Sequence, residues 1–110
     1  MTVRGRAAQT VRALAERLVE ELRPRKVGLF GSYASGRPHR DCDIDGLIVL
    51  DTQEPFFDRL ARARRAVAGL HPGVPLDPLV LTSREVEERT RAGEQFLAAV
   101  LERGEVLYAA

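Results

Sequence analysis

Residues 30–49 read Phe-Gly-Ser-Tyr-Ala-Ser-Gly-Arg-Pro-His-Arg-Asp-Cys-Asp-Ile-Asp-Gly-Leu-Ile-Val, and this stretch decides both the expected fold and the expected chemistry. The pair Gly31 and Ser32 follows an apolar run that ends at Phe30, which indicates a strand leading into a tight turn. Asp43 and Asp45 then open a second apolar run. Side chains at positions i and i+2 of a strand point to the same face. We therefore expect the two carboxylates to stand side by side at a strand end.

Paired carboxylates beside a turn with free backbone amides are suited to a nucleotide and its metal. Hard cations such as Mg²⁺ prefer oxygen ligands, and backbone N–H groups bind anions. At Gly31 the missing Cβ lets a phosphate approach the backbone, and the Ser32 hydroxyl can donate to a phosphate oxygen. Arg37 and Arg40, in the loop that follows, add positive charge against a triphosphate. The stretch therefore predicts nucleotide chemistry.

A third carboxylate, Asp77, lies within another apolar run. An unpaired buried charge is costly, so a shared metal would explain an acid at this position. Pro78 favours an extended backbone at Asp77, as a strand requires. Phosphoryl transfer chemistry needs a neutralised triphosphate and an activated oxygen nucleophile, and two Mg²⁺ ions about 4 Å apart can supply both. We expect Asp43 and Asp45 to bridge two such ions, with Asp77 as the third ligand.

The remaining sequence predicts an α/β fold, in which helices pack on a small mixed sheet. Helices are expected at residues 3–22, after Pro55, and from Ser83 to Gly104. The last of these is either one helix or two helices that part at Gly93. Strands are expected at residues 26–30, 43–50, 74–81 and 105–108. Thr82 and Glu85 form a plausible capping box. Pro75 and Pro78 predict an edge position or a bulge for the third strand, because proline cannot donate to the ladder.

Two groups of side chains on the helices are expected to have structural roles. Phe56, Phe57 and Phe96 are assigned to the core, with Phe57 the most exposed of the three. The arginines from Arg59 to Arg65 are assigned to the solvated face of a helix, with an acidic partner surface as the functional alternative.

The composition limits the class of protein. A chain of 110 residues with 45% apolar and 30% charged residues is expected to form one domain over residues 1–110. It has neither an apolar run near the roughly 20 residues that span a bilayer nor a secretory signal. A net charge of +1 gives no support for tight binding to nucleic acid. The single cysteine agrees with a cytoplasmic location. The oligomeric state stays open, self-association included.

Zinc and thiol chemistry are alternatives at the same loop. His39 and Cys42 lie three positions apart, but no second cysteine and histidine pair completes a tetrahedral zinc site. Cys42 as a nucleophile would depend on His39 as its base. Asp41 is expected to be a solvated loop acid rather than a fourth ligand.

On these residues the chain resembles the minimal nucleotidyltransferase family of the DNA polymerase beta-like superfamily. The matching positions are Phe30, Gly31, Ser32, Gly36, Cys42, Asp43, Asp45 and, for the third acid, Asp77. The closing Glu-Val-Leu-Tyr resembles the family's C-terminal ending. The departures are Cys42 where serine is usual, Gly46 where a large apolar residue is usual, and Pro78 after the third acid.

The resemblance implies a nucleotidyltransferase fold and transfer of a nucleoside monophosphate, commonly AMP from ATP, to an acceptor hydroxyl with Mg²⁺. It assigns catalysis and metal binding to Asp43, Asp45 and Asp77, and the β- and γ-phosphates to Gly31 and Ser32. Family members are often paired with a small helical HEPN toxin, so a tyrosine of a HEPN partner is the expected acceptor. The competing hypothesis is a binding module, an antitoxin that occludes its HEPN partner with little or no catalysis.

Overall fold

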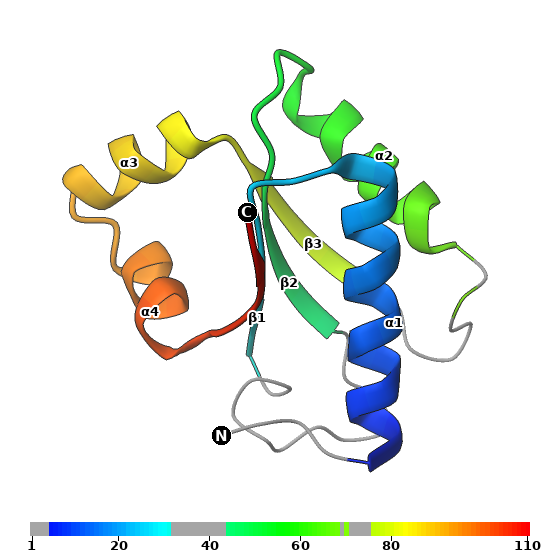
Figure 1. Ribbon diagram of the computed structural model, residues 1–110. Helices are drawn as coiled ribbons and strands as arrows, with labels where there is room; N and C mark the ends of the chain where they lie inside the picture. The colour runs from blue at the N-terminus through cyan, green and yellow to red at the C-terminus, as the bar shows by residue number, and fades with distance from the viewer. Residues whose placement is uncertain (1–4, 32–43, 69, 71–75) are drawn as a thin grey trace.

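The computed structural model describes residues 5–31, 44–68, 70 and 76–110, and it forms a mixed sheet between two layers of helices (Figure 1). In chain order the elements are α1 (Gly5–Leu22), β1 (Lys26–Phe30), β2 (Ile44–Val49), α2 (Phe56–Val67), β3 (Leu76–Leu81), α3 (Ser83–Arg91), α4 (Gln95–Arg103) and β4 (Glu105–Ala109). The strand order is β3-β2-β1-β4. β2 and β3 are parallel, while β1 is antiparallel to β2 and to β4. The predicted α/β fold with a mixed sheet is confirmed.

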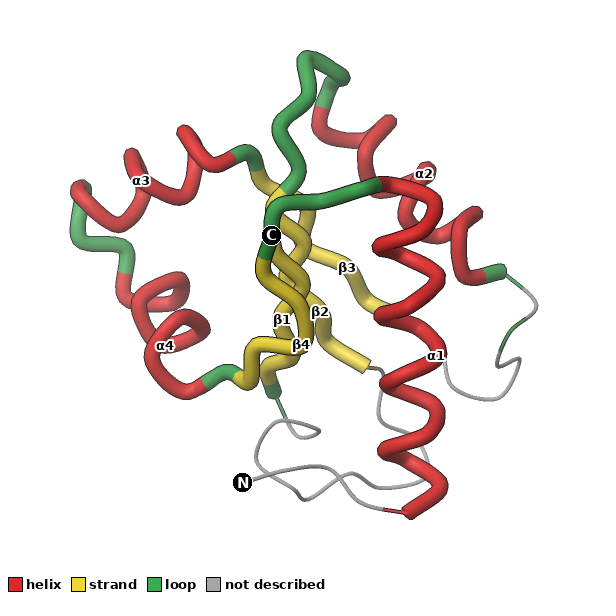
Figure 2. Tube along the Cα trace, in the orientation of Figure 1, coloured by secondary structure: helices red, strands yellow, loops and turns green. Residues whose placement is uncertain are grey.

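The two faces of the sheet are covered by different helices. α1 and α2 lie on one face, and α3 and α4 lie on the other (Figures 1 and 2). Because side chains alternate along a strand, Ile48 of β2 packs into the core under α1 and α2. Leu47 and Val49 of the same strand pack with Leu97 and Val100 of α4. β2 is thus buried on both faces.

α1 owes its position to one apolar stripe. Val11, Leu14, Leu18 and Leu22 recur at helical spacing, and each is buried. Burying a side chain of this size contributes about 1.5–3 kcal/mol, so the stripe rather than helix propensity holds α1 on the sheet. The helix ends at Leu22, before Pro24, as predicted. Residues 1–4 lie outside the described part of the chain.

The edge position predicted for β3 is confirmed. Among the described strands, β3 hydrogen-bonds to β2 alone, and Pro78 within it needs no donor on its outer side. Gly46, one of the departures from the family pattern, is the partner of Pro78 across the ladder. A Cβ built at Gly46 would meet Leu76 at 3.4 Å, which is ordinary contact. β2 therefore runs unbroken through Gly46.

The segment after β3 forms two helices, which settles the alternative that the sequence leaves open. They part around Gly93, whose φ is +79°. The capping box is confirmed, because the Glu85 N–H donates to Thr82 Oγ1 at 3.1 Å and the Thr82 N–H donates to Glu85 Oε1 at 2.8 Å. The Ser83 N–H and hydroxyl donate to Asp51, and these two bonds hold the pKa of Asp51 below its usual value. α3 therefore starts at a fixed place beside the sheet.

Arg59 corrects the assignment of the α2 arginines to a solvated face. Its side chain is only 8% exposed. The Arg59 Nε donates to the Glu54 carbonyl at 2.9 Å, and a second nitrogen donates to Glu85 Oε1 at 2.7 Å. Arg59 shares its helical face with Ala63 and Val67, one and two turns later, and both are buried. The ion pair therefore ties α2 to the first turn of α3.

The core assignment of the aromatic residues is wrong for all three. Phe57 is 78% exposed and is the most exposed of them, as expected. Phe96 is 55% exposed and Phe56 is 36% exposed, so neither is a core residue. Phe56 and Phe57 pack edge to face with ring centroids 5.5 Å apart. α2 and α4 therefore each present an aromatic surface to solvent.

Gly104 follows the last residue of α4, at the predicted end of this helical segment, and its φ of −74° is one that any residue can adopt. Its backbone approaches two carbonyl oxygens closely, because a Cβ there would lie 2.5 Å from Val100 O and 2.8 Å from Leu29 O. Glycine is thus required for the close passage of α4 over β1. In the described part of the chain, no helix combines the length and apolar character needed to cross a bilayer.

Candidate active site

Two of the predicted acids are brought together by the parallel ladder between β2 and β3. Asp45 and Asp77 are Cα partners across this ladder, on strands about 4.8 Å apart. Partners of this kind point to the same face of a sheet, here the α4 face, where Leu47 and Leu79 lie two residues further along. Asp45 is half-buried and Asp77 is exposed. The argument from a buried charge is therefore wrong for Asp77, which lies in an edge strand that solvent reaches.

The turn after β1 meets the same carboxylate. Phe30 is the partner of Asp45 on β1, so Gly31 follows directly beside it. Gly31 has a φ of +74°, in the left-handed region that favours glycine. A Cβ built at Gly31 would overlap with Asp45 Oδ2 and would lie 3.2 Å from Asp45 Cγ. Only a residue without a side chain lets the Asp45 carboxylate occupy this place against the turn.

Four of the predicted site residues cannot be placed. Ser32, Arg37, Arg40 and Asp43 lie outside the described residues. Within the described ranges, no three His, Cys, Asp or Glu side chains gather as a metal site. Asp45 and Asp77 nonetheless offer carboxylate oxygens on one face of adjacent strands, and Mg²⁺ is commonly held by one or two carboxylates together with substrate phosphates. The donor set therefore fits Mg²⁺.

An aromatic pair continues the row of side chains away from the acids. Phe30 packs edge to face with Phe96, the second residue of α4, with ring centroids 5.9 Å apart and planes at 84°. Phe30, Asp45 and Asp77 lie on one line across β1, β2 and β3. Phe96 therefore lies beside Phe30, the β1 member of this row. The sequence analysis does not identify Phe96 as a site residue. The available signal is that Phe96 precedes the buried Leu97 by one residue, so the two side chains are about 100° apart around the helix axis.

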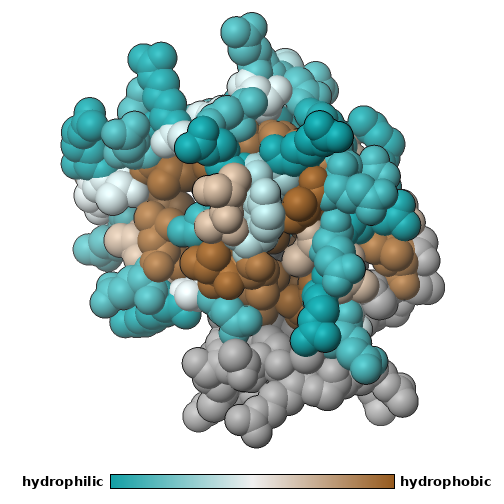
Figure 3. Space-filling model, viewed as in Figure 1, coloured by the Kyte–Doolittle hydropathy of each residue, from teal (hydrophilic) through white to brown (hydrophobic). Residues whose placement is uncertain are grey.

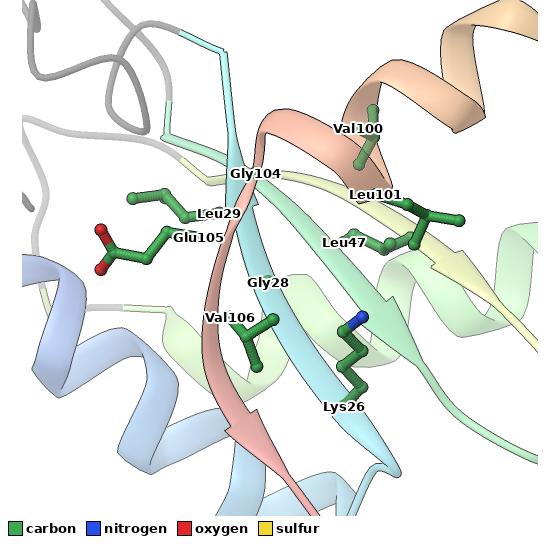
Figure 4. Close-up of a pocket in the computed structure, with 9 residues that line it drawn as sticks. All are labelled: Lys26, Gly28, Leu29, Leu47, Val100, Leu101, Gly104, Glu105 and Val106. Carbon is green, nitrogen blue, oxygen red and sulfur yellow. The ribbon is translucent and has the colours of Figure 1, made fainter. Parts of the chain in front are cut away.

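The space between α4 and the β1–β4 pair is a separate, shallow feature. It is lined by Lys26, Gly28, Leu29, Leu47, Val100, Leu101, Gly104, Glu105 and Val106 (Figure 4). Its volume of about 10 Å³ holds about one water molecule. Hydrophobic residues gather at the centre of this side of the molecule and hydrophilic ones surround them (Figure 3). This pocket is too small for a nucleotide, and it contains neither Asp45 nor Asp77.

Known proteins resemble this chain in family and in fold. A family model described as a nucleotidyltransferase domain matches residues 11–102. A solved toxin–antitoxin with AMP-PNP superposes with a TM-score of 0.62 at 22% identity, over 90% of this chain and 73% of that one. A chain described as a "putative nucleotidyltransferase from Sulfolobus solfataricus" superposes with a TM-score of 0.61 at 20% identity, over 96% of this chain and 90% of that one. No curated protein matches.

Proposed function

Because this chain belongs to the nucleotidyltransferase domain family, we propose that it transfers AMP from ATP to a tyrosine hydroxyl of a HEPN-family toxin partner. The proposal rests on one observation above all. Asp45 and Asp77 are partners on adjacent strands, and the Asp45 carboxylate lies against Gly31 at the turn after β1. This arrangement supports the proposal, because two acids and a backbone turn that lie together could contact one triphosphate.

Each residue has a distinct role in the proposed reaction. Asp43, Asp45 and Asp77 would hold two Mg²⁺ ions, which when bound neutralise the triphosphate and polarise the attacking hydroxyl. The backbone at Gly31 and the Ser32 hydroxyl position the β- and γ-phosphates. These assignments for Asp43 and Ser32 come from the sequence.

The transfer itself forms one O–P bond, breaks another and moves one proton. The tyrosine oxygen attacks the α-phosphorus of ATP, a new O–P bond forms, and the bond to pyrophosphate breaks. Asp77 accepts the proton of the hydroxyl. Arg37 and Arg40 supply positive charge for the departing pyrophosphate. The exposed position of Asp77 on the edge strand β3 suits an acceptor that arrives on another protein.

A labelling experiment tests this function. The chain is incubated with α-labelled ATP, Mg²⁺ and a HEPN-family partner, and label on the partner is measured. We expect Asp77→Asn to slow labelling by about 10²–10⁴-fold, the usual contribution of a proton acceptor. Asp58→Asn is the matched control, because Asp58 is an exposed carboxylate in the first turn of α2, on the other side of the sheet. Equal labelling by the parent and by Asp77→Asn would contradict the proposal.

Occlusion of the partner is the second candidate function. The solved toxin–antitoxin neighbour supports a protein partner, and the exposed pair Phe56 and Phe57 offers an apolar contact on α2. The double variant Asp43→Asn with Asp45→Asn separates the two functions. If this variant neutralises the toxin as well as the parent does, occlusion is sufficient and transfer is not required.

A further inference from the structure

Phe96 is an exposed aromatic residue whose position the fold fixes. More than half of its surface is open to solvent, at 55% exposure. Its ring is not loose, because the edge-to-face contact with Phe30 orients it. Leu97 and Val100, which follow it in α4, are buried against the sheet and hold the helix in place. The Phe96 ring is therefore an apolar surface that is exposed to solvent and already held in one orientation.

The location of this ring relates it to the acids. Phe30, to which it packs, is the cross-strand partner of Asp45. Antiparallel partners have Cα atoms about 4.5–5.5 Å apart, and the two rings are 5.9 Å apart. The Phe96 ring thus lies on the order of 10 Å from the Asp45 strand position, on the same face of the sheet. A ribose is the part of a nucleotide that bridges such a gap between a phosphate and a base.

We propose that Phe96 is a stacking platform for the nucleobase of the bound nucleoside triphosphate, and this inference rests on the proposed function. A base and an aromatic side chain stack with little dependence on base identity, since every base has a π-face. All four bases can therefore stack on this ring, and only a modest preference for purines is expected, because their rings are larger.

The test compares ATP with inorganic tripolyphosphate, which has the same phosphates and no base. Binding of each to the parent and to Phe96→Ala is measured by calorimetry in Mg²⁺. We expect Phe96→Ala to weaken ATP binding by about 5- to 150-fold, the effect of losing one base stack, and to leave tripolyphosphate binding unchanged. Phe96→Tyr should retain the affinity for ATP. The parent should bind ATP more tightly than CTP, and Phe96→Ala should remove that difference.

Phe57→Ala is the matched control for loss of an exposed ring. Phe57 is also exposed and also packs edge to face with another phenylalanine, but it lies on α2, on the opposite side of the sheet. We expect it to leave ATP binding unchanged. Thermal unfolding and far-ultraviolet circular dichroism of each variant confirm that the fold is kept.

The outcomes distinguish this inference from the proposed function. If Phe96→Ala binds ATP as tightly as the parent while Asp45→Asn loses Mg²⁺-dependent binding, the stacking inference is wrong and the proposed function stands. If Phe96→Ala loses ATP affinity selectively while Asp45→Asn has no effect, the platform stands and the proposed metal chemistry is wrong. A parent that binds neither ligand overturns both.

Discussion

Replacing Gly31 by alanine tests the contact between the turn and the Asp45 carboxylate. The backbone at Gly31 has a φ of +74°, and holding an alanine in the left-handed region costs about 1–2 kcal/mol. The new Cβ would also overlap with Asp45 Oδ2. Turning the Asp45 side chain off its rotamer to relieve this costs about 0.5–1.5 kcal/mol more. The expected loss of unfolding free energy is therefore about 1.5–3.5 kcal/mol in total.

Gly93→Ala separates the cost of the left-handed backbone from the cost of turning the Asp45 side chain. Gly93 has a φ of +79°, close to that of Gly31, but a Cβ built there meets nothing within 4 Å. It should lose only the backbone part, about 1–2 kcal/mol, which for a domain near this size lowers the Tm by roughly 4–8 °C per kcal/mol. Gly31→Ala should lose more stability than Gly93→Ala.

Nucleotide affinity gives the second measurement for the same pair of variants. Gly31→Ala displaces the Asp45 carboxylate and closes the approach of phosphate to the turn, so Mg²⁺-dependent ATP binding should fall. Gly93→Ala should bind ATP as the parent does, because Gly93 lies between α3 and α4. Thermal unfolding and calorimetric titration measure the two quantities. Equal destabilisation by both variants, with ATP binding kept by Gly31→Ala, would refute the reasoning.

Two further predictions concern stability. Glu85 is partly buried, which raises its pKa, but the hydrogen bond from Thr82 and the ion pair with Arg59 outweigh this and leave the pKa below its usual 4.5. The ionised Glu85 carboxylate therefore stabilises the fold above pH 4.5. This stabilisation is lost as the pH falls through the lower folded-state pKa. Glu85→Gln should show a smaller loss of Tm than the parent between pH 5 and pH 3, and an identical pH dependence would contradict this. Gly46→Ala should raise the unfolding free energy by about 0.4–1 kcal/mol, because the new Cβ meets only ordinary contacts and the unfolded chain loses conformational freedom. Denaturant unfolding measures this change. A destabilised variant would show that β2 cannot accept the methyl group.

The elements of this fold could be predicted from local patterns, because each has a local physical cause. β1 was expected at residues 26–30 and is found at Lys26–Phe30, where an apolar run lies between Pro24 and a glycine turn. The start of α3 followed from its capping box. The apolar stripe predicted α1. These signals reside within a few neighbouring residues, so no knowledge of the tertiary structure is needed to interpret them.

The errors have a different origin, since they concern side chains whose surroundings come from distant segments. Arg59 was assigned to solvent by its charge, but Glu85, which pairs with it, is 26 residues away. The spacing of Arg59 with Ala63 and Val67 indicates the buried face of the helix, but the charge of the side chain outweighs this signal in the sequence analysis. Phe96 was assigned to the core by its apolar ring, although it lies at the edge of the stripe that Leu97 and Val100 define. The pairing of Asp45 with Asp77 depends on strand register, which the sequence alone does not determine.

That register is held by the same residues that stabilise the sheet. A slip of β3 by one residue would turn every side chain to the opposite face. Asp77 would then press its carboxylate into the core under α1 and α2, where burial of an unpaired charge costs several kcal/mol. Val80 and Leu81, both fully buried on opposite faces, would exchange places. The packing that excludes this slip also keeps Asp77 beside Asp45, so core packing fixes the placement of the two acids.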